Sequence, residues 1–382
     1  MKKVFLTGFI GSKNLGDEAI FETLVSQLKK LPVHLTVATL DEVKTRRLVP
    51  DTVRANDFWA ITKCIRECDY VFLGGGGLLQ DETSVFNVPG HLWRLWLAKF
   101  FRKPILMIAI GVGPLISGVS RWLVKRTCAS AALITVRDQE SSQLLMDLGV
   151  DSKKVHVVTD PAVSFPLPQK ENNHPVALTF PEGGYIVVSF REISHGSNRW
   201  LPVSLKHKFN KIFRGPGTVD IFKQIAETLD EIADRFKLKI LFFPFLENRD
   251  EIIHQQILQH MRFKQSAQMF EGEPTPQAFC ALVKHSRFVV SMRLHACILA
   301  ARMNIPAIGL SYAPKVRSFF KSLGLNENCL ETQQFSRESA LRLVERLLKN
   351  EIEIKRILSG RTVQLSQLNE KNIQLIAREM KV

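Results

Sequence analysis

Short runs of apolar residues alternate along the chain with longer stretches in which apolar residues recur every three or four positions. The short runs are rich in β-branched residues and predict buried strands, whereas the longer stretches predict amphipathic helices. Strands that alternate with helices in this way favour βαβ units and a mainly parallel sheet. In the first half of the chain the strands are expected at residues 2–9, 34–40, 69–75, 104–111, 132–138 and 155–160.

The pattern breaks between residues 166 and 184, where Pro, Asn and Gly are frequent, as in a linker between domains. Further strands are expected afterwards at residues 185–192, 239–247, 287–293 and 305–312. We therefore expect an α/β protein with two doubly wound Rossmann-like domains facing a cleft, similar to glycosyltransferases of the B type (GT-B). The predicted domains are residues 1–170 and 180–345, followed by C-terminal helices over 346–382 with an interruption at Ser359 and Gly360.

The composition indicates the charge of the expected partner and the cellular compartment of the protein. Lys and Arg number 52 against 37 Asp and Glu, a net charge of +15, which predicts an anionic partner such as a phosphorylated substrate, a phospholipid surface or nucleic acid. Six cysteines lack the spacing of a disulfide framework and favour a reducing compartment. The first apolar run is too short for a signal peptide, and the longest, residues 104–119, is broken by Gly and Pro. We expect a cytoplasmic protein.

Candidate chemistry follows the first strand, in the segment from Gly8 to Glu18 (GFIGSKNLGDE). Its glycine spacing resembles a phosphate-binding loop, but the Lys-Ser/Thr of such loops is replaced by Asp17 and Glu18, which would repel phosphate. Asn14, Asp17 and Glu18 are better suited to accept hydrogen bonds from sugar hydroxyls or to remove a proton from one. Alternatively, Asp17 only stabilises the start of the following helix.

A second motif ends the strand at residues 69–75, where four consecutive glycines, residues 74–77, precede Asp81. Glycine contributes no packing, so Gly75, Gly76 and Gly77 predict a close approach of the backbone to a ligand or to another loop. A tight turn would also use glycine. Arg137 follows another strand and can bind an anion or form a surface salt bridge with Asp138.

The strongest cluster lies in the second domain. Arg293 and His295 fall at the end of one expected strand and the start of its helix, and Lys315 falls after the next strand. Neighbouring parallel strands would bring the three side chains together. Arginine and lysine suit a carboxylate or phosphate, and histidine is the side chain that ordinarily exchanges protons near neutral pH. Taken singly, each also has a purely structural explanation.

With these motifs in view, the chain resembles the polysaccharide pyruvyl transferase family, of the CsaB-like type. The resemblance rests on GFIGSKNLGDEAI, GGGGLLQDETS and SMRLHACILAARMNIPAIGLSYAPKV, with weaker matches in TVRDQES, VTDPA and SFRE between them in the expected order. It spans roughly residues 1–345. One departure is Ala313, where the family often has an Asp before Pro-Lys, and this leaves the acceptor contacts of that loop open.

The resemblance implies phosphoenolpyruvate as donor, a sugar acceptor that is often linked to polyprenyl diphosphate, and a cyclic pyruvate ketal as product. In Gram-positive secondary cell-wall polymers such a ketal anchors S-layer homology domains. The family's donor-binding and catalytic residues would be Arg293, His295 and Lys315. We expect Arg137 to assist on the donor and Asp17 or Asp81 to orient the acceptor hydroxyl. The reaction requires no metal and no cofactor, and none is expected.

Two further expectations concern partners. Residues 199–214 (RWLPVSLKHKFNKIFR) mix basic and apolar side chains, as interfacial segments do, and are expected either to dock on an anionic membrane or to form a solvated basic loop. A GT-B-type glycosyltransferase that uses a nucleotide sugar is the alternative function. Nucleic-acid binding is not expected, because the basic residues are scattered and no recognition motif accompanies them.

Overall fold

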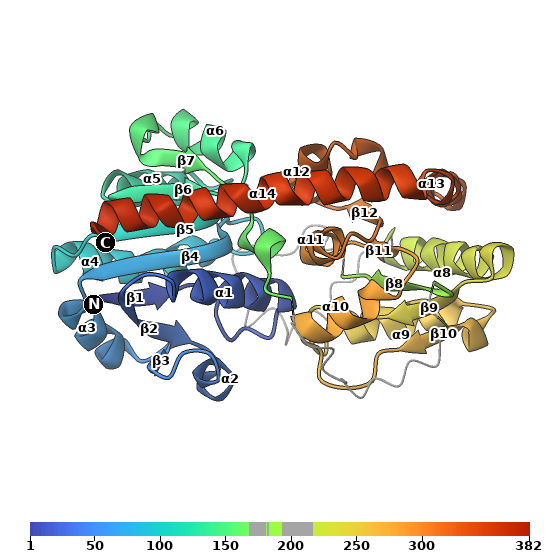
Figure 1. Ribbon diagram of the computed structural model, residues 1–382, viewed down its shortest axis with the longest axis horizontal. Helices are drawn as coiled ribbons and strands as arrows, with labels where there is room; N and C mark the ends of the chain where they lie inside the picture. Colours follow the sequence, from blue (N-terminus) through green and yellow to red (C-terminus); the bar gives the residue numbers. More distant parts are fainter. Residues whose placement is uncertain (168–180, 182, 193–216) are drawn as a thin grey trace.

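The computed structural model describes residues 1–167, 181, 183–192 and 217–382. It contains two α/β domains, each built around one parallel sheet, and the two sheets lie end to end along the longest axis (Figure 1). The fold class predicted from the sequence is therefore confirmed. Most of the expected linker and the whole basic segment 199–214 lie outside the described residues.

The N-terminal sheet has seven strands in the order β3-β2-β1-β4-β5-β6-β7, all parallel. Its strands are β1 (Lys2–Thr7), β2 (Val33–Thr39), β3 (Thr52–Arg54), β4 (Tyr70–Leu79), β5 (Ile105–Val112), β6 (Leu133–Val136) and β7 (Val155–Val157). Its helices are α1 (Leu15–Leu28), α2 (Glu42–Arg46), α3 (Phe58–Glu67), α4 (Asn87–Phe100), α5 (Gly118–Ala129) and α6 (Gln139–Asp147), with 3-10 turns η1 (Ser152–Lys154) and η2 (Pro161–Ser164).

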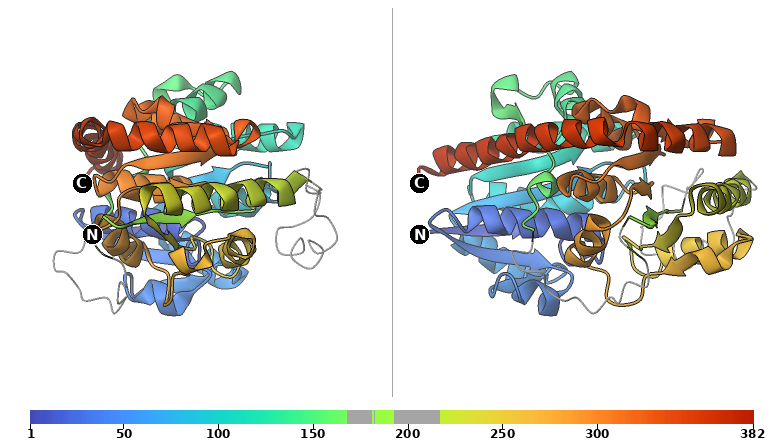
Figure 2. Two further views of the ribbon diagram at one scale, coloured as in Figure 1. Left: turned by 90° about the vertical axis from the view of Figure 1, so that its right-hand side faces the viewer. Right: turned by 45° about the vertical axis from the view of Figure 1, so that its right-hand side comes forward.

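Helices cover both faces of this sheet, which explains why β5 (ILMIAIGV) is buried along its whole length. Leu106 and Ile108 pack into the core beneath α1 and η2, whereas Met107 faces the opposite core beneath α3, α4 and α5. The alternation follows from the two-residue period of a strand. Figure 2 shows the helices on the two sides of the sheet.

The C-terminal sheet has six strands in the order β10-β9-β8-β11-β12-β13, also parallel. Its strands are β8 (Tyr185–Ser189), β9 (Lys239–Phe242), β10 (Ala267–Met269), β11 (Val289–Ser291), β12 (Ala307–Ser311) and β13 (Cys329–Glu331). Its helices are α8 (Gly217–Phe236), α9 (Asp250–His260), α10 (Pro276–Lys284), α11 (Leu294–Arg302), α12 (Pro314–Leu323) and α13 (Arg337–Lys349), with 3-10 turns η3 (Lys264–Ser266), η4 (Asn326–Asn328) and η5 (Thr332–Gln334).

The strand order of each sheet reverses at one place, and ligands of doubly wound proteins bind at such places. In the N-terminal sheet the reversal lies between β1 and β4, and in the C-terminal sheet between β8 and β11. The segment from Gly8 to Glu18 follows β1, and the four glycines end β4. Arg293 follows β11. The sequence motifs therefore lie at the two reversal points.

The last helix, α14 (Glu351–Met380), returns from the C-terminal domain and runs back along the N-terminal one (Figure 1). The predicted interruption at Ser359 and Gly360 is wrong, because both residues lie inside α14 and the break before it falls at Asn350. Glycine in a helix costs about 1 kcal/mol relative to alanine. Burial of apolar side chains such as Leu358 and Ile376 outweighs this cost. Among the helices of the described residues, none combines the length and apolarity needed to cross a membrane.

Candidate active site between the domains

The loop after β1 joins the two domains. The backbone amide of Leu15 donates to the carbonyl of Phe245 in the C-terminal domain at 2.9 Å, and Asn14 forms an antiparallel bridge with Leu246. Lys13 adds an ion pair with Glu247. These contacts bring the carboxyl-end loops of both sheets against each other. The candidate site is therefore built from both domains.

Asn14 fixes the carboxylate of Asp17. Oδ1 of Asn14 accepts a hydrogen bond from the amide of Gly16 at 3.2 Å, which caps α1, while Nδ2 donates to Oδ2 of Asp17 at 2.7 Å. Burial raises the pKa of Asp17, and the positive charges of His295 and Lys315 oppose this rise. His295 and Lys315, both from the C-terminal domain, are therefore close enough to Asp17 to affect its pKa.

The glycines of β4 make room for side chains. A Cβ added to Gly76 would lie 3.0 Å from Oδ1 of Asp17, and one added to Gly77 would lie 3.4 Å from Nη2 of Arg137. Gly75 and Gly76 also have positive φ angles of 24° and 91°. The close approach predicted from the sequence is thus to neighbouring side chains. Of the three glycines, Gly77 alone is exposed, so it is the one placed to meet a substrate.

Asp160, in the short loop between β7 and η2, contacts both Arg137 and His295. Its Oδ2 accepts a hydrogen bond from Nη1 of Arg137 at 3.1 Å and lies 3.5 Å from Nε2 of His295. Burial alone would raise the pKa of Asp160, but His295 and Arg137 lower it to about 2. The carboxylate is therefore ionised at neutral pH and faces an imidazole that comes from the other domain.

His295 also packs directly on the start of α1. A Cβ built on Gly16 would lie 2.0 Å from Nδ1 of His295, closer than any non-bonded contact allows. The absence of a side chain at position 16 therefore sets the position of the imidazole. His295 is mostly buried, with 15% of its side chain exposed.

Gly16→Ala is expected to displace this imidazole while leaving the fold intact, because alanine is favoured over glycine in a helix. A shift of about 1 Å in a catalytic group can lower turnover roughly 10²-fold, and we expect a loss of that order. The measurement is the rate of phosphate release from phosphoenolpyruvate, the donor that the family resemblance implies, together with the melting temperature. Gly118→Ala is the matched control, since Gly118 also starts a helix and has no atom near its would-be Cβ. Normal turnover in Gly16→Ala would contradict this placement.

Arg293 is held by Asp250, the first residue of α9. Nε of Arg293 donates to Oδ2 of Asp250 at 3.0 Å, and Nη2 donates to Oδ1. Oδ2 of Asp250 also accepts the amides of Phe245 and Leu246, each at 3.0 Å. Asp250 is buried and the Arg293 side chain is 12% exposed, so the guanidinium has a fixed direction.

Two basic side chains lie against Tyr312, which follows β12. Arg191 stacks on the ring with its guanidinium carbon 4.4 Å from the ring centre, and its Nη1 donates to the Tyr312 hydroxyl at 2.6 Å. Nζ of the exposed Lys315 lies 5.4 Å from the same ring centre. Arg249 is close enough to Arg191 for their like charges to interact. We call Arg191, Arg249, Arg293 and Lys315 the cationic cluster.

The structure thus places the predicted residues in two groups. Arg293 and Lys315 both act electrostatically on Tyr312, as part of the cationic cluster. His295 points instead to Asp160 and α1, on the side of the N-terminal domain. Asp17 interacts electrostatically with both groups, since His295 and Lys315 each act to lower its pKa.

Three residues of the site were not selected from the sequence: Asp250, Tyr312 and Arg249. Tyr312 is the last residue of the strand expected at 305–312, and this position is the signal that could have identified it. Asp250 and Arg249 begin a helix after a long loop. No feature of the sequence around Asp250 and Arg249 indicates that these two residues belong to the site.

Asp81 does not belong to the site. Its Oδ1 accepts the amide of Ile116 at 2.7 Å, and its Oδ2 accepts the amide of Ser117 at 2.8 Å. The residue is completely buried. Both oxygens are thus used to hold the turn before α5, which contradicts the predicted contact with an acceptor sugar.

Glu18 is also turned away from substrate. It is 4% exposed, and its Oε1 accepts no hydrogen bond from any residue the structure describes. Burial raises the pKa of Glu18 to about 7, although Lys44 opposes the rise. Neighbouring positions on a helix point in different directions, so Asp17 can face the site while Glu18 does not.

Glu18→Gln is expected to stabilise the protein at high pH. Because its pKa is raised from 4.5 to about 7, the folded state binds this proton more tightly, and wild-type stability falls as pH rises through that interval. The full difference corresponds to about 3 kcal/mol above pH 7. Urea unfolding at pH 5 and pH 8 measures it, with the exposed Glu338→Gln as control. A stability difference that did not grow with pH would contradict the expectation.

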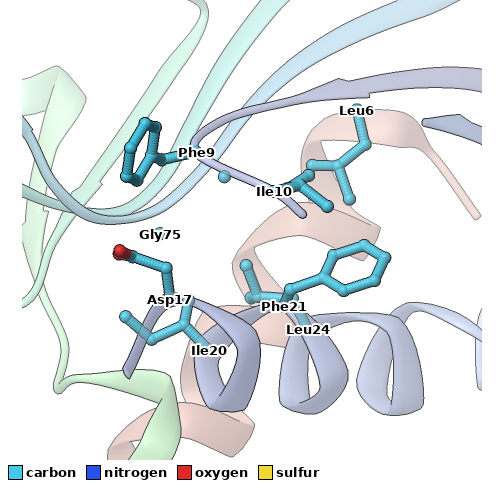
Figure 3. Close-up of a pocket in the computed structure, with 9 residues that line it drawn as sticks. Leu6, Phe9, Ile10, Asp17, Ile20, Phe21, Leu24 and Gly75 are labelled. Atoms are coloured by element: carbon cyan, nitrogen blue, oxygen red, sulfur yellow. The ribbon is translucent and has the colours of Figure 1, made fainter. Parts of the chain in front are cut away.

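A small cavity lies behind Asp17. It has a volume of about 10 Å³ and is lined mainly by apolar side chains, among them Phe9, Ile20 and Phe21. Figure 3 shows the carboxylate of Asp17 beside Gly75 at one side of it. A cavity of this size holds about one water molecule, so it is no substrate pocket.

Known proteins resemble this chain in family and in fold. A family model described as polysaccharide pyruvyl transferase matches residues 14–314. No curated protein sequence is significantly similar. Among solved structures, UDP-GlcNAc 2-epimerase from Methanocaldococcus jannaschii is 14% identical over 90% of this chain and 92% of that one, with a TM-score of 0.61.

Two other solved structures are similar to the same degree. A putative UDP-N-acetylglucosamine 2-epimerase from Listeria monocytogenes is 12% identical over 94% of this chain and 91% of that one, with a TM-score of 0.65. Anabaena HepE, in complex with UDP and glucose, is 10% identical over 100% of both chains, with a TM-score of 0.62. At these identities the likeness shows the GT-B fold alone.

Proposed function

Because this chain belongs to the polysaccharide pyruvyl transferase family, we propose that it transfers the pyruvyl group of phosphoenolpyruvate to a sugar of a cell-surface polysaccharide precursor. The observation that supports this most is the cationic cluster at the reversal point of the C-terminal sheet, together with the His295–Asp160 pair, since His295 and Lys315 both act on Asp17. A precursor of a secondary cell-wall polymer is one acceptor of this class.

The cationic cluster suits a small dianion with two different anionic groups. In phosphoenolpyruvate the carboxylate and the phosphate ester are both attached to C2. The fixed guanidinium of Arg293 matches a planar carboxylate, and the exposed ammonium of Lys315 suits the phosphate as a point charge. The start of α11 adds the positive end of a helix dipole.

The reaction requires one acid and one base. A proton added to the methylene carbon makes C2 electrophilic, and a sugar hydroxyl attacks C2 and gives up its proton. The bond between C2 and the phosphate oxygen then breaks, and a second hydroxyl attacks C2 and loses its proton to close the ketal. One donor and two hydroxyls thus give the ketal and inorganic phosphate.

We assign the base to His295 and the acid to Tyr312. Nε2 of His295 lies 3.5 Å from the ionised Asp160, an arrangement that orients an imidazole for proton transfer. Tyr312 lies among the cations that would hold the donor. Asp17, fixed by Asn14, would orient the acceptor hydroxyl from the N-terminal domain.

Tyr312→Phe is expected to lower turnover at least tenfold and to change its pH dependence. Burial alone would raise the pKa of Tyr312, but Lys315 and Arg191 lower it to about 7. As an acid, Tyr312 acts in its protonated form, so wild-type turnover should fall as pH rises above 7. This fall should be absent in Tyr312→Phe. Parallel pH profiles in the two proteins would remove Tyr312 from the mechanism.

The proposed reaction is tested by its products. Purified protein, phosphoenolpyruvate and a lipid-linked or soluble sugar acceptor should release one phosphate for each acceptor whose mass increases by a pyruvate ketal. A nucleotide-sugar glycosyltransferase is the alternative, because the similar Anabaena structure contains UDP and glucose. An acceptor that gains a hexose from UDP-glucose, with no change in phosphoenolpyruvate, would support that alternative and contradict the proposal.

A further inference from the structure

Exposed aromatic side chains concentrate on three neighbouring helices of the N-terminal domain. Trp59, Phe100 and Trp122 are 80%, 77% and 57% exposed. Four of the five tryptophans of the chain lie on α3, α4 and α5. The exposed large hydrophobic residues on these helices are Phe58, Trp59, Trp96, Phe100, Val119 and Trp122, and we call them the aromatic surface.

Side-chain contacts link the three helices that carry the aromatic surface. Phe58 on α3 stacks on Trp93 of α4, with ring centres 5.7 Å apart. Nε1 of Trp96 donates to the hydroxyl of Thr127 on α5 at 2.9 Å. The three helices also pack against one core on the same face of the sheet, opposite α1 and α14 (Figure 1). One approaching surface can therefore meet all three helices.

The same region has an unusual distribution of charge. Residues 83–137 contain eight Lys or Arg and no Asp or Glu. On α5 the basic side chains Arg121, Lys125 and Arg126 are exposed next to Trp122, and the Arg126 guanidinium lies 5.8 Å from the Trp122 ring centre. The charged side chains of α4 and α5 are all basic, whereas α3 carries Lys63, Arg66 and Glu67. An apolar, aromatic surface bordered mainly by positive charge suits a partner that is both apolar and anionic.

We propose that the aromatic surface docks the protein on a lipid bilayer that contains anionic phospholipid. Tryptophan is favoured at the boundary between head groups and acyl chains, and lysine and arginine bind anionic head groups. A second copy of the chain fits less well, because two such surfaces would bring like charges together without acidic partners from α4 or α5. This location differs from the expected membrane segment 199–214, which lies outside the described residues.

The aromatic surface is also placed to serve the candidate site. Helix α4 follows β4, so its first turn lies at the carboxyl edge of the sheet, where Gly77 and Asp17 are found. Docking through α4 would therefore hold the acceptor side of the site near the bilayer. This consequence rests on the proposed function, whereas membrane docking itself does not.

The test measures binding to vesicles. Wild-type protein should float with vesicles of phosphatidylglycerol and phosphatidylcholine, bind pure phosphatidylcholine at least tenfold more weakly, and lose binding as salt rises. The triple variant Trp59→Ser, Phe100→Ser, Trp122→Ser should bind the anionic vesicles at least tenfold more weakly than wild type. The matched control is Ile252→Ser, Ile352→Ser, Val363→Ser, which removes exposed apolar side chains elsewhere and should bind normally.

A second variant separates charge from folding. Arg121→Gln, Lys125→Gln, Arg126→Gln should also weaken binding at least tenfold while the melting temperature and the turnover of a soluble acceptor stay at wild-type values. Equal loss in the matched control, or full binding by both surface variants, would overturn the proposal. So would a wild-type dimer that the serine triple variant abolishes, or duplex DNA binding without vesicle binding.

Discussion

Replacement of His295 by alanine is expected to lower the rate of phosphate release from phosphoenolpyruvate by about 10²–10⁴-fold, the usual contribution of general acid–base catalysis. The imidazole contacts the ionised Asp160 and the start of α1 at Gly16, and the variant removes both contacts at once.

The loss must be separated from a loss of folding. His295→Ala should melt close to wild type, because Asp160 keeps its hydrogen bond from Arg137 when the imidazole is removed. His260→Ala, at the exposed end of α9, is the matched control and should keep full activity. Undiminished phosphate release in His295→Ala would exclude His295 from catalysis.

Replacement of Asp250 by alanine is expected to have the largest effect on stability, a loss of about 3–5 kcal/mol in the free energy of unfolding of the C-terminal domain. The change leaves the mostly buried guanidinium of Arg293 without its carboxylate and removes the acceptor of two backbone amides. Urea unfolding measures the loss. Asp234→Ala, which removes only an exposed ion pair with Lys237, should cost less than about 1 kcal/mol.

The double variant Asp250→Ala, Arg293→Ala distinguishes support of the fold from binding of the donor. Removing both partners leaves no unpaired buried charge, so the double variant should be more stable than the sum of the single changes predicts. Its affinity for phosphoenolpyruvate should nevertheless stay low, because the guanidinium is gone. Wild-type donor affinity in the double variant would mean that Arg293 serves the fold alone.

Much of the fold was predictable because the central strands carry strong signals. All ten expected strands are present, and those at the centre, such as β5, are apolar throughout. The three strands that the sequence did not predict, β3, β10 and β13, have three residues each and lie at or next to the edges of their sheets. A short, half-buried strand depends on its neighbour for pairing and leaves little pattern of its own.

The length and path of the last helix, α14, could not be predicted from the sequence for a related reason. Ser359 and Gly360 have weak helix propensity, which predicts an end there. Asn369, further along α14, is buried and donates to the carbonyl of Asp160 at 3.3 Å and to Ser164 at 3.0 Å. Such contacts between residues far apart in the chain determine the length of α14 and support the loop that carries Asp160.

For the candidate site, too, the position of a residue relative to the strands was predictable, whereas the direction of its side chain was not. The rule that ligands bind beyond the carboxyl ends of strands selected Arg293, His295 and Lys315, and the structure places all three after strands of the C-terminal sheet. It could not say that Asp81 caps a buried turn or that Glu18 faces away, because both depend on which side of an element a residue occupies after packing. Nor could it show that Gly16 makes room for a histidine from the other domain.

Binding of phosphoenolpyruvate to the cationic cluster is tested most directly by the melting temperature of the wild-type protein with this ligand. A ligand that binds only the folded state stabilises it, by about 2.7 kcal/mol at a concentration 100 times its dissociation constant. We expect phosphoenolpyruvate to raise the melting temperature of wild type and to lose this effect in Lys315→Ala, while UDP changes neither protein. Stabilisation by UDP but not by phosphoenolpyruvate would contradict the assigned donor.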